Sequence, residues 1–312
     1  MKINKIFAYV ICFLFLIIFI PTNLLALEKK QITDDAIWKQ KISTLNFINY
    51  DKGKDHNLTI PNSNAQMNIL ENEYYLLNEG VRQYVWWAFG HDTENNTMII
   101  GPDYVIYMYY NDDGYVKIDD WEKVNPTDLI EQMRKANQKI DDTKTYAKEI
   151  NWIYKPALDT TNNIVSYSYG VLWSNGNKSM ETKNLILGKA GYLSQTFVFE
   201  KLSNPKENSE YALDTAKFVK FNEGYTYQNF TSGDKIAAVG IGALVAGSLG
   251  VKAMKSAGSV AAATGGLLLF LKKFWWILLA PLAFLGKFFN SGDKKEEEEV
   301  SSENSKRRKV KK

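Results

Sequence analysis

The sequence predicts an α+β fold in which helices pack on a mostly antiparallel sheet, followed by hydrophobic C-terminal membrane helices. Residues 150–199 alternate apolar and polar side chains in several runs that short, turn-rich pieces separate, a pattern that favours an antiparallel meander. Asn125-Pro126 opens an amphipathic stretch that is typical of a helix. Residues 236–289 contain few charges and many apolar side chains, which indicates a membrane region.

The composition excludes several classes of protein. The chain has 312 residues, and its 38 Lys and Arg against 35 Asp and Glu give a net charge of +3, which is too balanced for a protein that binds nucleic acid as a whole. Hydrophobic residues make up 45% of the chain, so wholesale disorder is excluded. Because there is one cysteine, Cys12, and only two histidines, we expect neither a disulfide framework nor a Cys/His zinc site.

Residues 1–26 have the order of a secretory signal peptide. Lys2 and Lys5 precede an apolar run at 6–20, and the small residue Ala26 offers a cleavage point. The alternative is an uncleaved signal anchor, because the apolar run is long. The other predicted parts are an exported α+β domain at 27–233, a hydrophobic membrane-anchoring helical region at 234–289 and a disordered charged tail at 290–312.

Three helices are expected in the exported domain from the spacing of apolar residues. The first follows Asn78, which could cap it, the second begins at Asn125-Pro126, and the third covers 209–218. The apolar faces of the first two are formed by Val81, Tyr84, Val85 and Phe89, and by Leu129, Ile130, Met133, Ala136 and Ile140.

Runs of aromatic, β-branched and alternating residues predict the strands. Asp113-Gly114 lies between two of these runs, 104–110 and 115–118, and predicts a hairpin because its turn needs a positive φ that Asp and Gly tolerate. The other predicted strands are 73–77, 97–101, 150–154, 164–172, 182–187 and 192–199.

Catalytic, cofactor-binding and metal residues are not predicted. The nucleophile-elbow, phosphate-loop and His-Glu-x-x-His motifs do not occur. The alternative is an envelope hydrolase or glycan-binding enzyme that uses Asp112, Asp113, Asp119 and Asp120. A calcium loop built from the same acids fails on spacing, because Tyr109 would occupy the first ligand position. The many Tyr and Trp residues are expected mainly in the core, although they could also line a carbohydrate or peptide groove.

Small residues recur every four positions at Ala238, Gly242, Ala246 and Gly250. This spacing places them on one face of a helix, and in lipid such a face lets two helix backbones approach closely. The sequence therefore predicts membrane helix packing, with self-association of helices, through these four residues.

Two further apolar segments follow, at 257–271 and 274–289, separated by charges. Lys272 and Lys273 beside Trp275 and Trp276 are predicted to be interfacial anchors, because lysine and tryptophan both favour the membrane surface. The basic end of the tail, which contains Lys311 and Lys312, is expected on the cytoplasmic side. With an exported domain, this orientation requires one or three crossings.

Four stretches also carry a family resemblance. They are 109–117 (YYNDDGYVK), Asn151-Trp152, 221–227 (FNEGYTY) and 233–240 (GDKIAAVG). With these, the chain resembles, from about Trp38 to Phe289, the bacterial family catalogued as domain of unknown function 2167, a set of predicted membrane-anchored proteins. The resemblance implies an exported domain with a membrane anchor. It implies no activity, so it assigns no catalytic residue.

The function expected from the sequence is that of a membrane-anchored extracytoplasmic protein of the cell envelope, acting as a binding or structural module. Its expected partner is the lipid bilayer. No nucleic acid and no cofactor are expected, and the external ligand is not identified by any motif.

Overall fold

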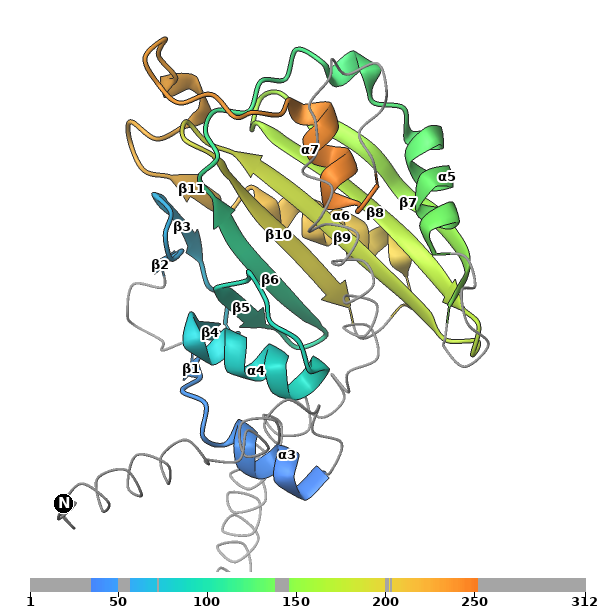
Figure 1. The fold of residues 1–312 in the computed structure, drawn as a ribbon. Helices are drawn as coiled ribbons and strands as arrows, with labels where there is room; N and C mark the ends of the chain where they lie inside the picture. The colour runs from blue at the N-terminus through green and yellow to red at the C-terminus, as the bar shows by residue number, and fades with distance from the viewer. Residues whose placement is uncertain are drawn as a thin grey trace, which may run out of the picture.

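An eight-stranded, fully antiparallel sheet lies at the centre of the molecule (Figure 1). The computed structural model describes residues 35–49, 57–71, 73–137, 146–199, 202 and 204–251. The strand order is β1-β4-β5-β6-β10-β9-β8-β7. The strands are β1 (Ile48–Asn49), β4 (Tyr74–Leu77), β5 (Thr97–Ile100), β6 (Tyr104–Asn111), β7 (Ala147–Asp159), β8 (Ile164–Trp173), β9 (Lys178–Leu187) and β10 (Tyr192–Phe199).

Strands β7 to β10 form the antiparallel meander that the sequence predicts. Short turns join them, and Asn163 and Gly176 adopt positive φ values of 56° and 86° in two of these turns. Seven of the eight residues of β10 are buried, because other elements cover both faces of the sheet. The α+β class is therefore confirmed for the described part of the chain.

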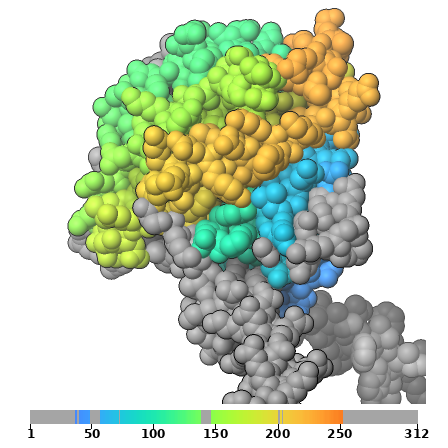
Figure 2. Space-filling model, turned by 180° about the vertical axis from the view of Figure 1, so that it is seen from behind, coloured from blue at the N-terminus to red at the C-terminus, as the bar shows by residue number. Residues whose placement is uncertain are grey.

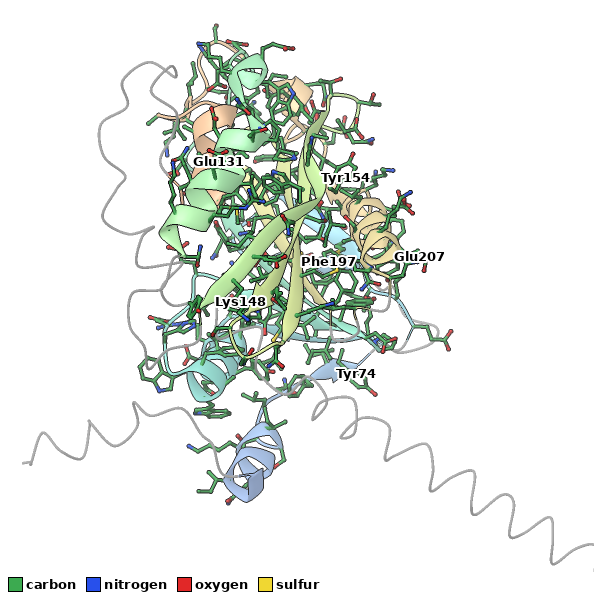
Figure 3. The ribbon with its side chains drawn as sticks, turned by 90° about the vertical axis from the view of Figure 1, so that its right-hand side faces the viewer. Tyr74, Glu131, Lys148, Tyr154, Phe197 and Glu207 are labelled. Carbon is green, nitrogen blue, oxygen red and sulfur yellow. The ribbon has the colours of Figure 1, made fainter. Side chains whose placement is uncertain are left out.

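Helices cover both faces of the sheet (Figures 1 and 3). The front face in Figure 1 carries α4 (Glu79–Phe89), α5 (Pro126–Ala136) and α7 (Ile241–Ser248), and the back face carries α6 (Pro205–Ala216). A second, three-stranded antiparallel sheet packs on the back face beside α6, in the order β11-β3-β2. Its strands are β2 (Asn57–Thr59), β3 (Ala65–Asn68) and β11 (Val219–Phe221), and the remaining described helices are α3 (Asp35–Ile42), η2 (Trp121–Lys123) and η3 (Tyr227–Asn229).

The predicted helix start at Asn125 is confirmed. The Asn125 side chain accepts hydrogen bonds from the backbone N–H groups of Thr127 and Asp128 at 3.0 and 3.4 Å, and Pro126 is the first helical residue. Of the expected apolar stripe, Leu129, Ile130 and Met133 are buried, whereas Ala136 is exposed and Ile140 lies outside the described residues.

The predicted helix after Asn78 is also present as α4. Its expected apolar face is confirmed, since Val81, Tyr84, Val85 and Phe89 are all buried. Asn78 itself makes no side-chain capping bond, because its backbone adopts a positive φ of 48°. The helix ends at Gly90, whose left-handed conformation lets its N–H bond the Trp86 carbonyl.

The predicted hairpin between 104–110 and 115–118 is wrong. Gly114 has the positive φ of 114° that the turn signal indicates, but the chain beyond it does not return along β6. Instead Tyr115 bridges Ile236 in parallel: its N–H donates to the Lys235 carbonyl at 2.8 Å, and its carbonyl accepts from Ala237 N–H at 2.9 Å. The positive φ at Gly114 agrees with the local turn signal, but the strand partner of Tyr115 lies more than a hundred residues away.

The folded domain extends past the boundary predicted at Gly233. Helix α7 lies against the front face of the sheet, where Ile241, Leu244 and Val245 are buried in the core with Leu129 of α5. Residues 234–251 are therefore part of the α+β domain and not the start of a separate region. No helix in the described part of the chain is long and apolar enough to cross a membrane.

Candidate functional site

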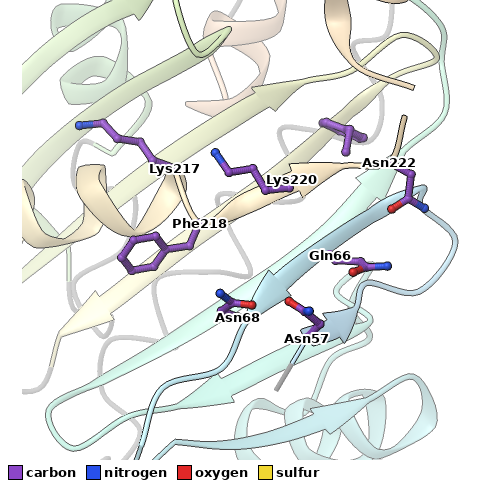
Figure 4. A pocket seen from close by; sticks show the side chains of 8 residues that line it. Asn57, Gln66, Asn68, Lys217, Phe218, Lys220 and Asn222 are labelled. Carbon is purple, nitrogen blue, oxygen red and sulfur yellow. The ribbon is translucent and has the colours of Figure 1, made fainter. Parts of the chain in front are cut away.

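A polar groove opens on the outer surface of the three-stranded sheet (Figure 4). Its volume is about 500 Å³, within the range of roughly 300–1,000 Å³ that is usual for ligand sites. Seen from behind, this region lies where α6 meets the small sheet (Figure 2). The groove is lined by Asn57, Gln66, Asn68, Lys217, Phe218, Lys220, Phe221 and Asn222.

Strand alternation places the polar side chains of the groove on one surface. In β3 the burial pattern alternates, with Ala65 and Met67 facing the core and Gln66 and Asn68 facing outward. The antiparallel register sets Gln66 opposite Lys220 of β11, and it sets Asn68 opposite Asn57 of β2. Side chains that are paired in this way lie about 4.5–5.5 Å apart at Cβ, so the four polar groups form one continuous patch.

Phe218 and Asn222 continue the same alternation on either side of β11 (Figure 4). Phe218 follows the end of α6 and keeps 44% of its surface exposed. The backbone N–H of Asn222 donates to the Asn64 carbonyl at 2.8 Å, which holds this end of the groove against the turn before β3. The groove thus has an aromatic ring at one end and an amide at the other.

The charge of the groove is positive. Lys217 and Lys220 both line it, and no Asp or Glu does so. Lys217 is partly neutralised, because its ammonium lies 2.8 Å from the Asp214 carboxylate of α6, and this partner raises the pKa of Lys217. Lys220 extends from the middle of β11 and is exposed.

Phe221 closes one wall of the groove by packing inward. Its ring lies edge-on to that of Tyr110, with centroids 6.3 Å apart, and it covers the backbone at Gly188. A Cβ atom at Gly188 would lie 2.7 Å from the Phe221 ring, which is closer than van der Waals contact permits. Glycine at 188 therefore lets the small sheet and the loop after β9 approach each other.

A buried row of hydrogen bonds fixes α6 behind the groove. The Asn184 amide donates to the Gln195 side chain at 2.9 Å and to the Ala212 carbonyl of α6 at 3.0 Å, and it accepts from the Ser166 hydroxyl at 2.7 Å. These side chains occupy directly paired positions on β8, β9 and β10. Since α6 leads directly into Lys217 and Phe218, this row positions one side of the groove.

A second polar link reaches α6 from the loop before β4. The buried Glu73 carboxylate accepts from the Leu70 N–H at 2.6 Å and from the Tyr104 hydroxyl at 2.5 Å, and the Tyr104 hydroxyl lies 2.8 Å from that of Tyr211 on α6. Burial raises the pKa of Glu73, although both hydrogen bonds act in the opposite direction. Burial and the nearby carboxylate raise the pKa of Tyr104.

The four aspartates of the predicted alternative enzyme lie outside the groove. Asp112, Asp113 and Asp119 are exposed in the loop after β6. Asp120 accepts a hydrogen bond from Gly242 N–H, with both carboxylate oxygens at 3.3 Å, so its carboxylate lies at the start of α7. Among the residues that the structure describes, no cluster of three or more His, Cys, Asp and Glu could hold a metal ion.

The four small residues that were predicted to form one helix face do not all lie in one helix. Only Gly242 and Ala246 lie in α7, which begins at Ile241 and ends at Ser248, and Ala238 precedes it. Gly250 follows it with a positive φ of 68°. Ala246 is buried against the sheet, and a Cβ at Gly242 would lie 3.0 Å from the Asp120 carboxylate.

The single long helix face expected from Ala238 to Gly250 is therefore not formed. The packing of these residues against another helix in lipid stays a prediction. The predicted interfacial anchors Lys272, Lys273, Trp275 and Trp276 lie outside the described residues.

Sequence reasoning missed every residue of the groove. Its strands are three or four residues long, and Val219 pairs with Met67 across a large separation in sequence. Asn, Gln and Lys on short strands form no motif. Two signals were available in the sequence: the alternation from Val219 to Asn222, in which the apolar Val219 and Phe221 flank Lys220, and the family stretch 221–227, which begins within the groove.

The chain was compared with known structures, curated proteins and protein families. The solution structure of cyanobacterial PsbP (CyanoP) from Synechocystis sp. PCC 6803 aligns with a TM-score of 0.34 and 8% sequence identity, covering 57% of this chain and 94% of that one. No curated protein matches the sequence. The family model described as "Protein of unknown function (DUF2167)" matches residues 52–283, which is most of the chain and confirms the resemblance found in the sequence. The chain belongs to this family.

Proposed function

We propose that the protein is a binding module of the cell envelope, whose exported α+β domain captures a polar ligand in the groove while the C-terminal segment holds the domain at the membrane. The groove is the observation that carries this proposal. Its amides donate and accept hydrogen bonds, and its ammonium groups donate them. Such a lining suits reversible binding better than proton transfer or nucleophilic attack.

Membrane attachment is supported by the sequence on both sides of the domain. The N-terminal residues have the order of a signal peptide. At the other end α7 is already used to cover the sheet, so the attached segment begins after Val251. There, residues 257–271 and 274–289 are almost entirely apolar and are flanked by lysines and tryptophans.

The orientation follows from the charges of the tail. Residues 306–312 contain six Lys and Arg, and positive segments next to membrane helices remain in the cytoplasm. The groove would then face the periplasm or the cell exterior, and the chain would cross the membrane once or three times.

Single-cysteine labelling in intact cells tests the proposal directly. In a Cys12→Ala background, Asn222→Cys places one thiol at the groove, and the matched variant Ser302→Cys places one thiol in the tail. We expect a membrane-impermeant maleimide to label position 222 in intact cells and position 302 only after the membrane is disrupted. Both variants should sediment with membranes and require detergent for extraction.

Two results would contradict the proposal. One is recovery of the full-length protein in a soluble fraction without detergent. The other is protection of Asn222→Cys in intact cells together with labelling after disruption, since this would place the groove on the cytoplasmic side.

A further inference from the structure

The amide side chains of the groove provide hydrogen-bond donors and acceptors that suit the hydroxyl groups of a ligand. Each Asn or Gln side chain provides two N–H donors and a carbonyl acceptor, whereas each hydroxyl donates one hydrogen bond and accepts up to two. Gln66, Asn68 and Asn222 present such amides from neighbouring rows of the small sheet. A ligand with hydroxyls on successive rings could bond to several of these amides at once, whereas an apolar ligand would leave them without partners at a cost.

The charges of the groove favour a carboxylate on that ligand. Lys220 is exposed in the middle of β11, whereas the Lys217 ammonium forms an ion pair with the Asp214 carboxylate at 2.8 Å. The described residues that line the groove include two lysines and no arginine. Lysine binds an anion as a point charge and not as a paired donor, so a carboxylate with a single negative charge suits Lys220.

Phe218 supplies an apolar surface at the edge of the polar patch. Its ring is 44% exposed, and it is adjacent to Lys217 and within the groove lining (Figure 4). An aromatic ring next to hydrogen-bonding groups suits a ligand that has one apolar side and one polar side. Sugar rings have this character, since their C–H groups gather on one face while their hydroxyls project from the edge.

From these three observations we infer that the groove binds an acidic oligosaccharide, a chain of hydroxyl-bearing rings that carry carboxylate groups. This inference rests on the proposed function and names its ligand class. The amides bind the ring hydroxyls, Lys220 binds a carboxylate, and Phe218 covers the apolar side of one ring.

Calorimetric titration of the detergent-solubilised full-length protein with a short oligogalacturonate tests the inference. The methyl ester of the same oligosaccharide is the matched probe, because it keeps the rings and loses the charges. We expect the ester to bind at least about tenfold more weakly, as the loss of a charge-assisted hydrogen bond implies.

Variants locate the binding in the groove. Lys220→Gln and Phe218→Ala should each lower the affinity for the oligogalacturonate by about tenfold. Lys206→Gln is the control, because Lys206 carries the same charge at the opposite end of α6 and is highly exposed beside Glu210. The affinity of the Lys206→Gln variant for the oligogalacturonate should stay within about twofold of that of the unmodified protein.

Several outcomes would overturn the inference. They are no binding of oligogalacturonate, equal binding of its methyl ester, binding of oligoglutamate or inorganic phosphate as tightly as the oligosaccharide, and equal weakening by Lys206→Gln and Lys220→Gln. None of these would overturn the proposed location, because thiol labelling reports the orientation of the domain without any ligand.

Discussion

The two faces of the large sheet are covered in different ways. On the back face, the Asn184 amide joins β9 to β8, β10 and α6 through hydrogen bonds, and Glu73 reaches α6 through two tyrosine hydroxyls. On the front face, α7 contributes a nearly apolar surface, and Ser248 at its end contacts the sheet through polar groups: its hydroxyl lies 2.6 Å from that of Tyr167, and its carbonyl accepts from the Lys183 ammonium at 3.3 Å. Hydrogen bonds therefore fix the position of α6 closely, whereas burial of apolar surface dominates the attachment of α7.

This difference explains why α7 has the sequence of a membrane segment. Up to Ser248, α7 consists only of Ala, Gly, Val, Ile and Leu. Such a surface can cover a sheet or face lipid, because neither environment requires hydrogen bonds from these side chains. What separates the two cases is length. Helix α7 has eight residues, which is far below the roughly 20 that a membrane-spanning helix needs.

The largest effect is expected when α7 is removed. A chain of residues 27–233 lacks the buried side chains Ile241, Leu244, Val245 and Leu249, each of which contributes about 1.5–3 kcal/mol when fully buried. The total is comparable with the roughly 5–15 kcal/mol that stabilises a whole domain. We expect 27–233 to be largely unfolded by circular dichroism, and 27–251 to unfold cooperatively on heating.

A pair of substitutions sharpens this test in the full-length protein. Val245→Ser places a hydroxyl at a buried position of α7, whereas Ala243→Ser places one at a half-buried position of the same helix. The first should lower the melting temperature of the domain clearly more than the second. Equal effects, or equal stability of 27–233 and 27–251, would show that α7 is not part of the core.

An intermediate effect is expected on the back face from Asn184→Ala. The change leaves the Gln195 side chain, the Ser166 hydroxyl and the Ala212 carbonyl without their buried partner, and each buried group left unsatisfied costs about 1–3 kcal/mol. We expect urea unfolding to show a loss of about 3 kcal/mol. Asn177→Ala, at an exposed turn position, is the control, and a similar loss in both variants would contradict this account of α6.

The smallest effect is expected from Glu73→Gln, and it depends on pH. Because burial raises the pKa of Glu73 above its ordinary value of 4.5, the folded protein holds this proton more tightly than the unfolded chain does. Ionisation therefore lowers the unfolding free energy as the pH rises from 4.5 through the raised pKa of the folded state. The glutamine variant cannot ionise at this position, so it does not lose this unfolding free energy. The difference in unfolding free energy between the variant and the unmodified protein should therefore shift in favour of the variant as the pH rises over the same interval. Parallel stability curves would contradict a buried, hard-to-ionise Glu73.

The parts of the fold that the sequence predicted are those governed by neighbouring residues. The meander from β7 to β10 follows from alternation and short turns, and the start of α5 follows from Asn125 and its bonds to the next turn. The segment after Gly114 was predicted wrongly because its partner is Ile236, and no local pattern carries that information.

The groove could not be predicted for the same physical reason. It exists because β11 joins β3, so that Lys220 lies opposite Gln66, and because Gly188 admits the Phe221 ring. No local pattern marks these residues as a site, and only the pairing of distant strands brings them together. The membrane prediction for 236–250 differed from the fold because composition alone does not distinguish a protein core from lipid.

Amide hydrogen exchange of the full-length protein tests most directly whether α7 belongs to the α+β domain. The account predicts that the amides of Leu244, Val245 and Ser248 exchange as slowly as those in the middle of β8 and β9, and that they speed up together with them in denaturant. Exchange as fast as in an unfolded chain, or protection that survives when the sheet has unfolded in the presence of lipid, would contradict it.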